Sequence, residues 1–90
     1  MTPVTRSATL PNRDGLHARS CTAIVTTARK YAASLTIACA GKSGDGRSIF
    51  DLMLLGAGKG AVLEITADGK DAGALLAAVV ALVESGFGEE

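Results

Sequence analysis

The clearest constraint on the fold is a run of alternating hydrophobic and polar residues in the second half of the chain. Within residues 61–67, Leu63 and Ile65 fall on one side and their neighbours fall on the other. This period of two is typical of a β-strand that buries one face. Residues 35–40 repeat the pattern. We therefore predict a sheet with one buried face and one exposed face.

Two other stretches have a helical period, with hydrophobic residues three and four positions apart. After His17, the recurring positions are Cys21, Ile24, Val25, Ala28 and Ala32. They predict an amphipathic helix of about three turns that is interrupted near residues 31–34. A second stripe consists of Leu75, Leu76, Val79, Leu82 and Val83. It predicts a last helix that Asp71 can cap and Gly86 can end.

The remaining elements have weaker signals. Residues 4–9 alternate weakly and predict a strand, and residues 43–46 predict a short edge strand. Ser48, followed by an acidic residue three positions later, resembles a capping box and predicts a short helix ending at Gly56. We expect residues 87–90 to form a loose tail.

The predicted order is β-α-β-β-α-β-α within a single domain that spans residues 1–90. Short strands with hairpin links favour an antiparallel sheet that is covered on one side only. We therefore predict an α+β fold, an open-faced two-layer sandwich with a four-stranded antiparallel sheet and three helices on one face.

Composition excludes several classes of function. Nine basic and nine acidic residues cancel, and the chain has one Tyr, two Phe and no Trp, which disfavours nucleic-acid binding. No predicted helix has a basic face for a membrane surface, and the longest hydrophobic run, residues 74–83, is too short to span a bilayer. Residues 1–6 lack the pattern of a signal peptide, so we expect a cytoplasmic protein.

His17 is the only histidine, and it lies between a turn with Gly15 and the start of the predicted first helix. The backbone N–H groups of Ala18 and Arg19, in the first turn, can bind an anion. The helix dipole disfavours the charged imidazolium and so keeps the ring nucleophilic, and the Arg19 side chain can add a positive charge. We therefore predict that His17 holds a phosphoryl group. The alternative is a structural or helix-capping histidine.

Other reactive groups have simpler interpretations. Cys21 lies four residues after His17 and could pair with it, but it is in register with the buried stripe and is expected to be inert. Cys39 ends the inward face of its strand and is interpreted in the same way. The chain has no CxxC and no second histidine, so we predict neither a metal nor a cofactor. The glycine-rich residues 56–60 precede a strand and lack phosphate-loop spacing, which indicates a mobile connector.

The short second helix has two features of functional interest. Ser48 is interpreted first as its N-cap, but a phosphate on Ser48 would be tolerated there and would change the local charge by about two units. Ile49, Phe50 and Met53 cannot all point inward together with the two leucines of this helix. We interpret these three side chains as a docking patch for a partner.

The runs Gly15–Arg19 (GLHAR) and Arg47–Phe50 (RSIF) resemble the two signatures of the histidine-containing phosphocarrier (HPr) family of the bacterial phosphotransferase system. The resemblance extends over about residues 4–85. It implies that Nδ1 of His17 accepts a phosphoryl group from Enzyme I and passes it to A-type domains, with Arg19 stabilising the group. It also implies a monomer, docking through the first two helices, and modification of Ser48 by an HPr kinase/phosphorylase.

The chain departs from the family pattern at three positions. Ser20 and Cys21 stand where Pro-Ala is usual, so the geometry around the histidine is expected to be looser or the helix start shifted. Asp51 places an acid beside the docking patch. The MLLGA run after Phe50 and the FGE ending are similar to nitrogen-type regulatory relatives. Two alternatives therefore stay open: a regulatory carrier that moves no sugar, and an interaction module with a structural histidine.

Overall fold

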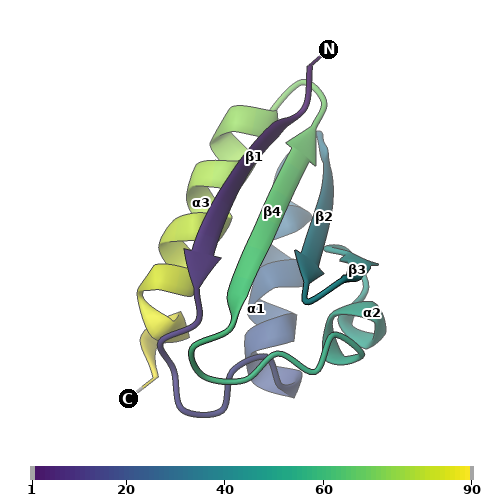
Figure 1. The fold of residues 1–90 in the computed structure, drawn as a ribbon. Coiled ribbons are helices and arrows are strands. Elements are labelled where there is room, and N and C mark those ends of the chain that lie inside the picture. Colours follow the sequence, from purple (N-terminus) through teal and green to yellow (C-terminus); the bar gives the residue numbers. More distant parts are fainter. Residues whose placement is uncertain (1, 90) are drawn as a thin grey trace.

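The computed structural model describes residues 2–89 as a β-sheet covered on one face by helices, which confirms the predicted fold (Figure 1). The strands lie side by side in the order β1-β4-β2-β3, and every neighbouring pair is antiparallel. The strands are β1 (Val4–Thr9), β2 (Ser34–Cys39), β3 (Lys42–Asp45) and β4 (Val62–Asp68). The helices are α1 (Ala18–Ala28), α2 (Ile49–Met53) and α3 (Ala72–Glu84).

Strand β4 lies between β1 and β2 and carries the centre of the hydrophobic core. Leu63 is opposite Ala8 of β1, and Ile65 is opposite Ile37 of β2; all four side chains are buried. Glu64, Thr66 and Asp68 occupy the other face of β4, as the alternation predicts, together with the exposed Val62 at its start. One buried face and one exposed face give the sheet a fixed register, because a slip of one residue would expose these core side chains.

The helices cover the buried face of the sheet. Helix α3 packs on β1 and β4, α1 lies against α3 and α2, and α2 lies next to β3 (Figure 1). The predicted stripe of α1 is buried, except that the helix ends at Ala28 and leaves Ala32 exposed. The connector after the helix already turns toward β2 at this point. None of the helices within residues 2–89 has the length and hydrophobicity that crossing a bilayer requires.

The side chain of Arg47, in the loop before α2, forms hydrogen bonds at the C-terminal end of α1. Nη2 of Arg47 donates to the carbonyl oxygens of Ala28 (3.0 Å), Tyr31 (2.7 Å) and Ala33 (3.1 Å). Helix α1 has no basic residue in its own last turn. The Arg47 guanidinium therefore bonds the last carbonyl of α1, which also accepts from the Tyr31 N–H at 3.3 Å, and two carbonyls of the turn that follows, and it places a positive charge at the negative end of the helix dipole.

We expect Arg47→Met to lower the free energy of unfolding by about 1–3 kcal/mol, because it removes charged donors from these carbonyl groups. Urea denaturation measures the change. Arg29→Met is the matched control, since Arg29 lies at the same helix end and the residues described here give its side chain no hydrogen bond. Equal losses for the two variants would show that the carbonyl contacts contribute nothing measurable.

Two helix starts differ in detail from the prediction. Asp71 occupies the N-cap position of α3, but its side chain makes no capping bond; Oδ2 accepts instead from the Ala32 N–H at 2.8 Å. Ser48 is the N-cap of α2, and its Oγ accepts from the Asp51 N–H at 3.1 Å. The Asp51 carboxylate does not complete a capping box, because it accepts from the Asp45 N–H at 3.1 Å. Both carboxylates join separate parts of the chain.

Helix α2 and the C-terminus also differ from their predicted extents. Helix α2 ends at Met53 rather than continuing to Gly56. The predicted loose tail is wrong for the residues that the structure describes: Gly86 ends α3 with a φ of +68°, and residues 86–88 form a 3-10 turn. Glu89 then reaches back to the loop before α1. Glu90, the last residue of the predicted tail, lies outside the described residues.

Candidate functional site

His17 is the N-cap of α1, with extended backbone and a side chain that is 32% exposed. The loop that leads to it is fixed at Gly15, whose φ is +58°. The next residue, Leu16, donates its N–H to the carbonyl of Ala57 at 2.9 Å and is itself buried. The positive φ of Gly15 turns the chain, and the hydrogen bond of Leu16 to Ala57 fixes it there. His17 is thereby placed at the N-terminus of α1.

Ser20 ties this loop to the first turn of α1. Its Oγ accepts from the His17 N–H at 2.9 Å and donates to the carbonyl of Gly15 at 2.9 Å, and the side chain is fully buried. The sequence predicts a looser geometry or a shifted helix start because this serine replaces the usual proline. In the structure α1 begins at Ala18 with His17 as its N-cap, and hydrogen bonds of Ser20 hold the backbone on both sides of Leu16.

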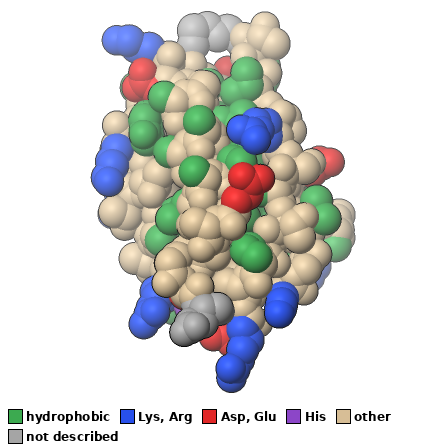
Figure 2. All heavy atoms as spheres, turned by 90° about the vertical axis from the view of Figure 1, so that its left-hand side faces the viewer, with side chains coloured by type: hydrophobic (Ala, Val, Ile, Leu, Met, Phe, Trp, Pro, Cys, Tyr) green, Lys and Arg blue, Asp and Glu red, His purple; other side chains and the backbone are tan. Residues whose placement is uncertain are grey.

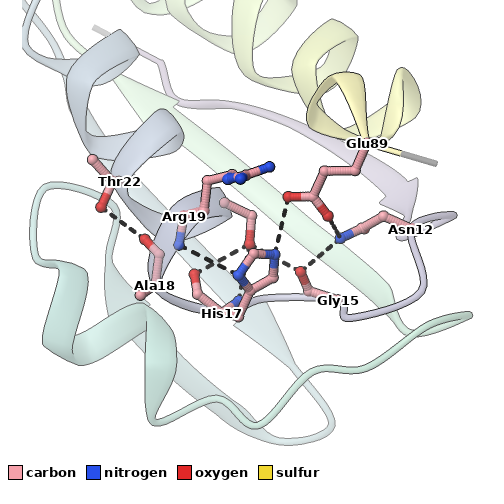
Figure 3. A network of polar contacts seen from close by, with 8 residues as sticks. Asn12, Gly15, His17, Ala18, Arg19, Thr22 and Glu89 are labelled. Atoms are coloured by element: carbon pink, nitrogen blue, oxygen red, sulfur yellow. Dashed lines mark hydrogen bonds and ion pairs between the residues drawn. The ribbon is translucent and has the colours of Figure 1, made fainter.

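Both ring nitrogens of His17 have partners (Figure 3). The Arg19 N–H donates to Nδ1 over a long 3.4 Å, and Nε2 lies 3.0 Å from Oε2 of Glu89. The other carboxylate oxygen of Glu89 accepts from Nδ2 of Asn12 at 3.1 Å, and the same Nδ2 donates to the carbonyl of Gly15 at 2.8 Å. The ring therefore lies between the first turn of α1 and the C-terminal residues.

Neither Asn12 nor Glu89 was predicted as part of the site. Asn12 lies in a run of turn-forming residues, which accounts for it without any contact to the histidine. Glu89 is 72 positions away from His17, and no local pattern connects two residues so far apart. The short turn after Gly86 is the feature that brings Glu89 to the site.

An open hollow in the surface surrounds the ring. It is lined by Arg13, Asp14, His17, Ala18, Arg19, Gly88 and Glu89. The structure thus brings together the predicted residues His17, Ala18 and Arg19, and it adds a second cation, Arg13. Several Lys and Arg side chains gather at this end of the molecule, where the C-terminus lies (Figure 2). An incoming dianion would meet two guanidinium groups and the N–H groups of a helix start.

Metal-ligand chemistry has weaker support at the same place. Asp14, His17 and Glu89 each offer one ligand atom, and these atoms lie within 4.8 Å of one another. Arg13 and Arg19 line the same hollow, so a cation would meet two positive charges there. The two guanidinium groups and the N–H groups of the helix start therefore suit a phosphate-sized anion better than the Asp14, His17 and Glu89 cluster suits a metal ion.

Cys21 does not form the thiolate–imidazole pair that its spacing from His17 allows. Its side chain is fully buried within the stripe of α1, and burial raises the pKa of the thiol. The group therefore stays protonated at neutral pH and is a poor nucleophile. Cys39 is also buried, and both cysteines are free. The interpretation of Cys21 and Cys39 as core residues is confirmed.

Helix α2 presents hydrophobic side chains to solvent beside α1. Phe50 is 71% exposed, Met53 47% and Ile49 37%, as the sequence predicts. Leu54, the residue after the helix, is 59% exposed and extends the surface. We call these four residues the α2 patch. Leu52 is buried, so the helix uses one side for packing and leaves the other free.

An open-faced α+β sandwich with a half-exposed histidine at the start of its first helix is the arrangement of one class, the histidine-containing phosphocarrier proteins. Residues 4–85 match the family described as the PTS HPr component phosphorylation site. The chain therefore belongs to the HPr family of phosphocarrier proteins of the phosphotransferase system. Glu89 lies beyond the matched residues.

Individual relatives agree with this assignment over almost their whole length. The chain is 36% identical over 89 residues to the phosphocarrier protein NPr of Shewanella violacea, covering 99% of this chain and 98% of the relative. It is 34% identical over 82 residues to the phosphocarrier protein HPr of Xylella fastidiosa, covering 91% and 92%. The crystal structure of HPr-C-His from Thermoanaerobacter tengcongensis superimposes with a TM-score of 0.88 at 37% identity, covering 100% of this chain and 99% of that one.

Proposed function

We propose that His17 accepts a phosphoryl group from phosphorylated Enzyme I and passes it to A-type domains of the phosphotransferase system. One observation carries the proposal: the ring lines a hollow together with Arg13 and Arg19, and its Nδ1 faces the Arg19 N–H in the first turn of α1. Membership of the HPr family supports the same assignment. We expect the carrier to act as a monomer in the cytoplasm, where these partners are proposed to meet it.

The proposed transfer is an in-line displacement in which the protein contributes position and charge. Nδ1 attacks phosphorus, and the phosphoryl oxygens then lie over the first-turn N–H groups of Ala18 and Arg19. These groups have no partners within the helix and can donate to the anion. The guanidinium groups of Arg13 and Arg19 offset its charge. The long contact between Arg19 N–H and Nδ1 is weak enough to be replaced.

The α2 patch is the proposed docking surface for these partners, because it is exposed and lies against the helix that carries His17. Asp51 belongs to the same helix as the patch, and its carboxylate accepts a hydrogen bond from the Asp45 N–H. Modification of Ser48 stays a prediction. A phosphate there would lie near the carboxylates of Asp45 and Asp51, whose repulsion offsets the benefit of an anion at the helix start. It would also place negative charge directly before Ile49 of the α2 patch, so we expect it to weaken docking.

A second candidate is a regulatory phosphorelay that moves no sugar. The 36% identity to a protein named NPr over 99% of this chain favours it. The two functions differ in the acceptor, so purified A-type domains of the sugar-specific and nitrogen-type classes discriminate between them. Faster transfer to the nitrogen-type domain would favour the regulatory function, and faster transfer to the sugar-specific domain would favour uptake.

Incubation with phosphoenolpyruvate and Enzyme I tests the proposal itself. We expect about one phosphate per chain, labile in acid and stable in base, as for a phosphoramidate on histidine. The phosphate should disappear when an A-type domain is added. A chain that takes up no phosphate but binds a partner through the α2 patch would instead be an interaction module with a structural histidine.

A further inference from the structure

The carboxylate of Glu89 contacts the ring nitrogen that the proposed phosphoryl transfer does not use. Oε2 of Glu89 lies 3.0 Å from Nε2 of His17, and the Glu89 side chain is only 12% exposed. Asn12 donates to the other oxygen of the same carboxylate at 3.1 Å. Glu89 is therefore held in place from a second side, and little water competes for its contact with the ring.

These contacts define which ring nitrogen carries the proton. A backbone N–H can only donate, so Nδ1, which accepts from Arg19, carries an electron pair rather than a proton. An ionised carboxylate can only accept, so Nε2 must donate to Glu89. Both contacts require the same neutral tautomer. The contact with Glu89 is the shorter of the two and involves a charge, so it has the larger influence.

We propose that Glu89 is a positioning residue for phosphoryl transfer: it holds the proton of the His17 ring on Nε2 and keeps the electron pair of Nδ1 available for attack. The inference rests on the proposed function of His17. It adds a residue that lies beyond the span matched by the family, residues 4–85.

The same contact stabilises the product of the transfer. The electron pair of Nδ1 forms the new bond to phosphorus, while the bond between phosphorus and the donor breaks and its electron pair stays with the donor atom. Nδ1 carries no proton, so none has to leave. The ring gains a positive charge and keeps its proton on Nε2, directly opposite the Glu89 carboxylate. The carboxylate offsets that charge.

Other charged groups around the ring do not substitute for Glu89. Arg13, Asp14 and Arg19 line the same hollow, but no hydrogen bond connects their side chains to the ring among the described residues. The two arginines disfavour positive charge on the ring, and Asp14 is exposed to solvent, which screens its charge. Glu89 alone combines a direct contact with burial.

The test compares Glu89→Ala, Glu89→Gln and the matched control Glu84→Ala, which removes an exposed carboxylate from the last turn of α3. Nitrogen-15 spectra of the ring at neutral pH report the proton on each ring nitrogen. We expect proton occupancy of Nε2 in the wild type and in Glu84→Ala, and a mixture of tautomers in Glu89→Ala. Gln has one acceptor oxygen for two donors, Asn12 Nδ2–H and His17 Nε2–H, so Glu89→Gln should hold the tautomer less firmly than Glu89 and without the charge.

Transfer from phosphorylated Enzyme I provides the second measurement. We expect kcat to fall about tenfold in Glu89→Ala, the order expected for losing one charge-assisted hydrogen bond at a half-exposed ring. Glu89→Gln should fall between Glu89→Ala and the wild type. KM should stay unchanged in both, because the α2 patch is untouched. Glu84→Ala should match the wild type in both measurements.

Two failures are distinguishable. If Glu89→Ala shows the wild-type ring spectrum and the wild-type kcat, the inference about Glu89 is wrong while phosphoryl transfer stands. If the wild type takes up no phosphate, the proposed function is wrong, and the inference about catalysis falls with it. A changed spectrum without any change in kcat would also contradict the inference, because the tautomer would then not limit transfer.

Discussion

His17→Asn is expected to abolish the acid-labile phosphate completely. His17 supplies the only imidazole in the chain, and the buried Cys21 thiol cannot replace it. Asn is chosen because its side-chain oxygen can cap α1 as the ring does, so the helix start is preserved. Labelling with phosphoenolpyruvate and Enzyme I, followed by acid treatment, measures the effect.

The variant must remain folded for this loss to be informative. We expect its free energy of unfolding to lie within about 1 kcal/mol of the wild type, since the ring is half-exposed and Asn conserves the cap. Arg19→Ala, at the neighbouring position, is expected to keep the phosphate but to form it about 10–100 times more slowly. Full labelling of a folded His17→Asn protein would move the acceptor to another residue.

Gly15→Ala is expected to have the largest effect on stability. A Cβ at this position would lie 2.3 Å from the carbonyl oxygen of Ala57 and 2.6 Å from Cα of Gly58, and both are backbone atoms. The φ of +58° adds strain for a residue other than glycine. Strain and overlap together should lower the free energy of unfolding by about 3–5 kcal/mol, a large share of the roughly 5–15 kcal/mol that is typical of a domain.

Gly56→Ala is the matched control for this substitution. Its φ is +62°, but a Cβ there would meet nothing within 4 Å. It should cost only the backbone strain, about 1–2 kcal/mol. Urea denaturation of both variants separates the two contributions. If they lose equal stability, the contact between the histidine loop and the residue 57–58 connector is not needed to hold the site.

Gly15→Ala should also slow phosphoryl transfer. Leu16 is anchored to Ala57 directly after Gly15, so any shift that relieves the overlap moves the backbone next to His17. Small displacements of a reacting group reduce rates strongly. We expect whatever folded fraction of Gly15→Ala remains to transfer more slowly than Gly56→Ala at equal amounts of folded protein.

Most of the fold could be predicted from the sequence because local patterns and burial agree. The alternation around Leu63 and Ile65 specified a half-buried strand, and the spacing of Cys21 and Ile24 specified one face of a helix. The predicted elements appear in the predicted order. Where local signals were weak, as after Gly86, the prediction of a loose tail was wrong because a long-range contact orders Glu89.

The candidate site could be predicted only in part, for the same physical reason. His17 and Arg19 are close in sequence, so a helix start necessarily brings them together. Asn12 and Glu89 meet the ring only through tertiary structure. The role of Ser20 likewise depends on the carbonyl of Gly15, which the turn places within its reach. Single Glu, Asn and Ser residues form no sequence pattern that would identify the distant groups they contact in the folded chain.

The position of the phosphate on the ring tests the central proposal most directly. Phosphorus and nitrogen NMR of the nitrogen-15-labelled, phosphorylated protein would identify the atom that carries the group. We predict a single phosphate on Nδ1 of His17, with the proton kept on Nε2 beside Glu89. After incubation with phosphorylated Enzyme I, phosphate on Nε2, or on a hydroxyl group in place of His17, would contradict the proposed transfer through Nδ1.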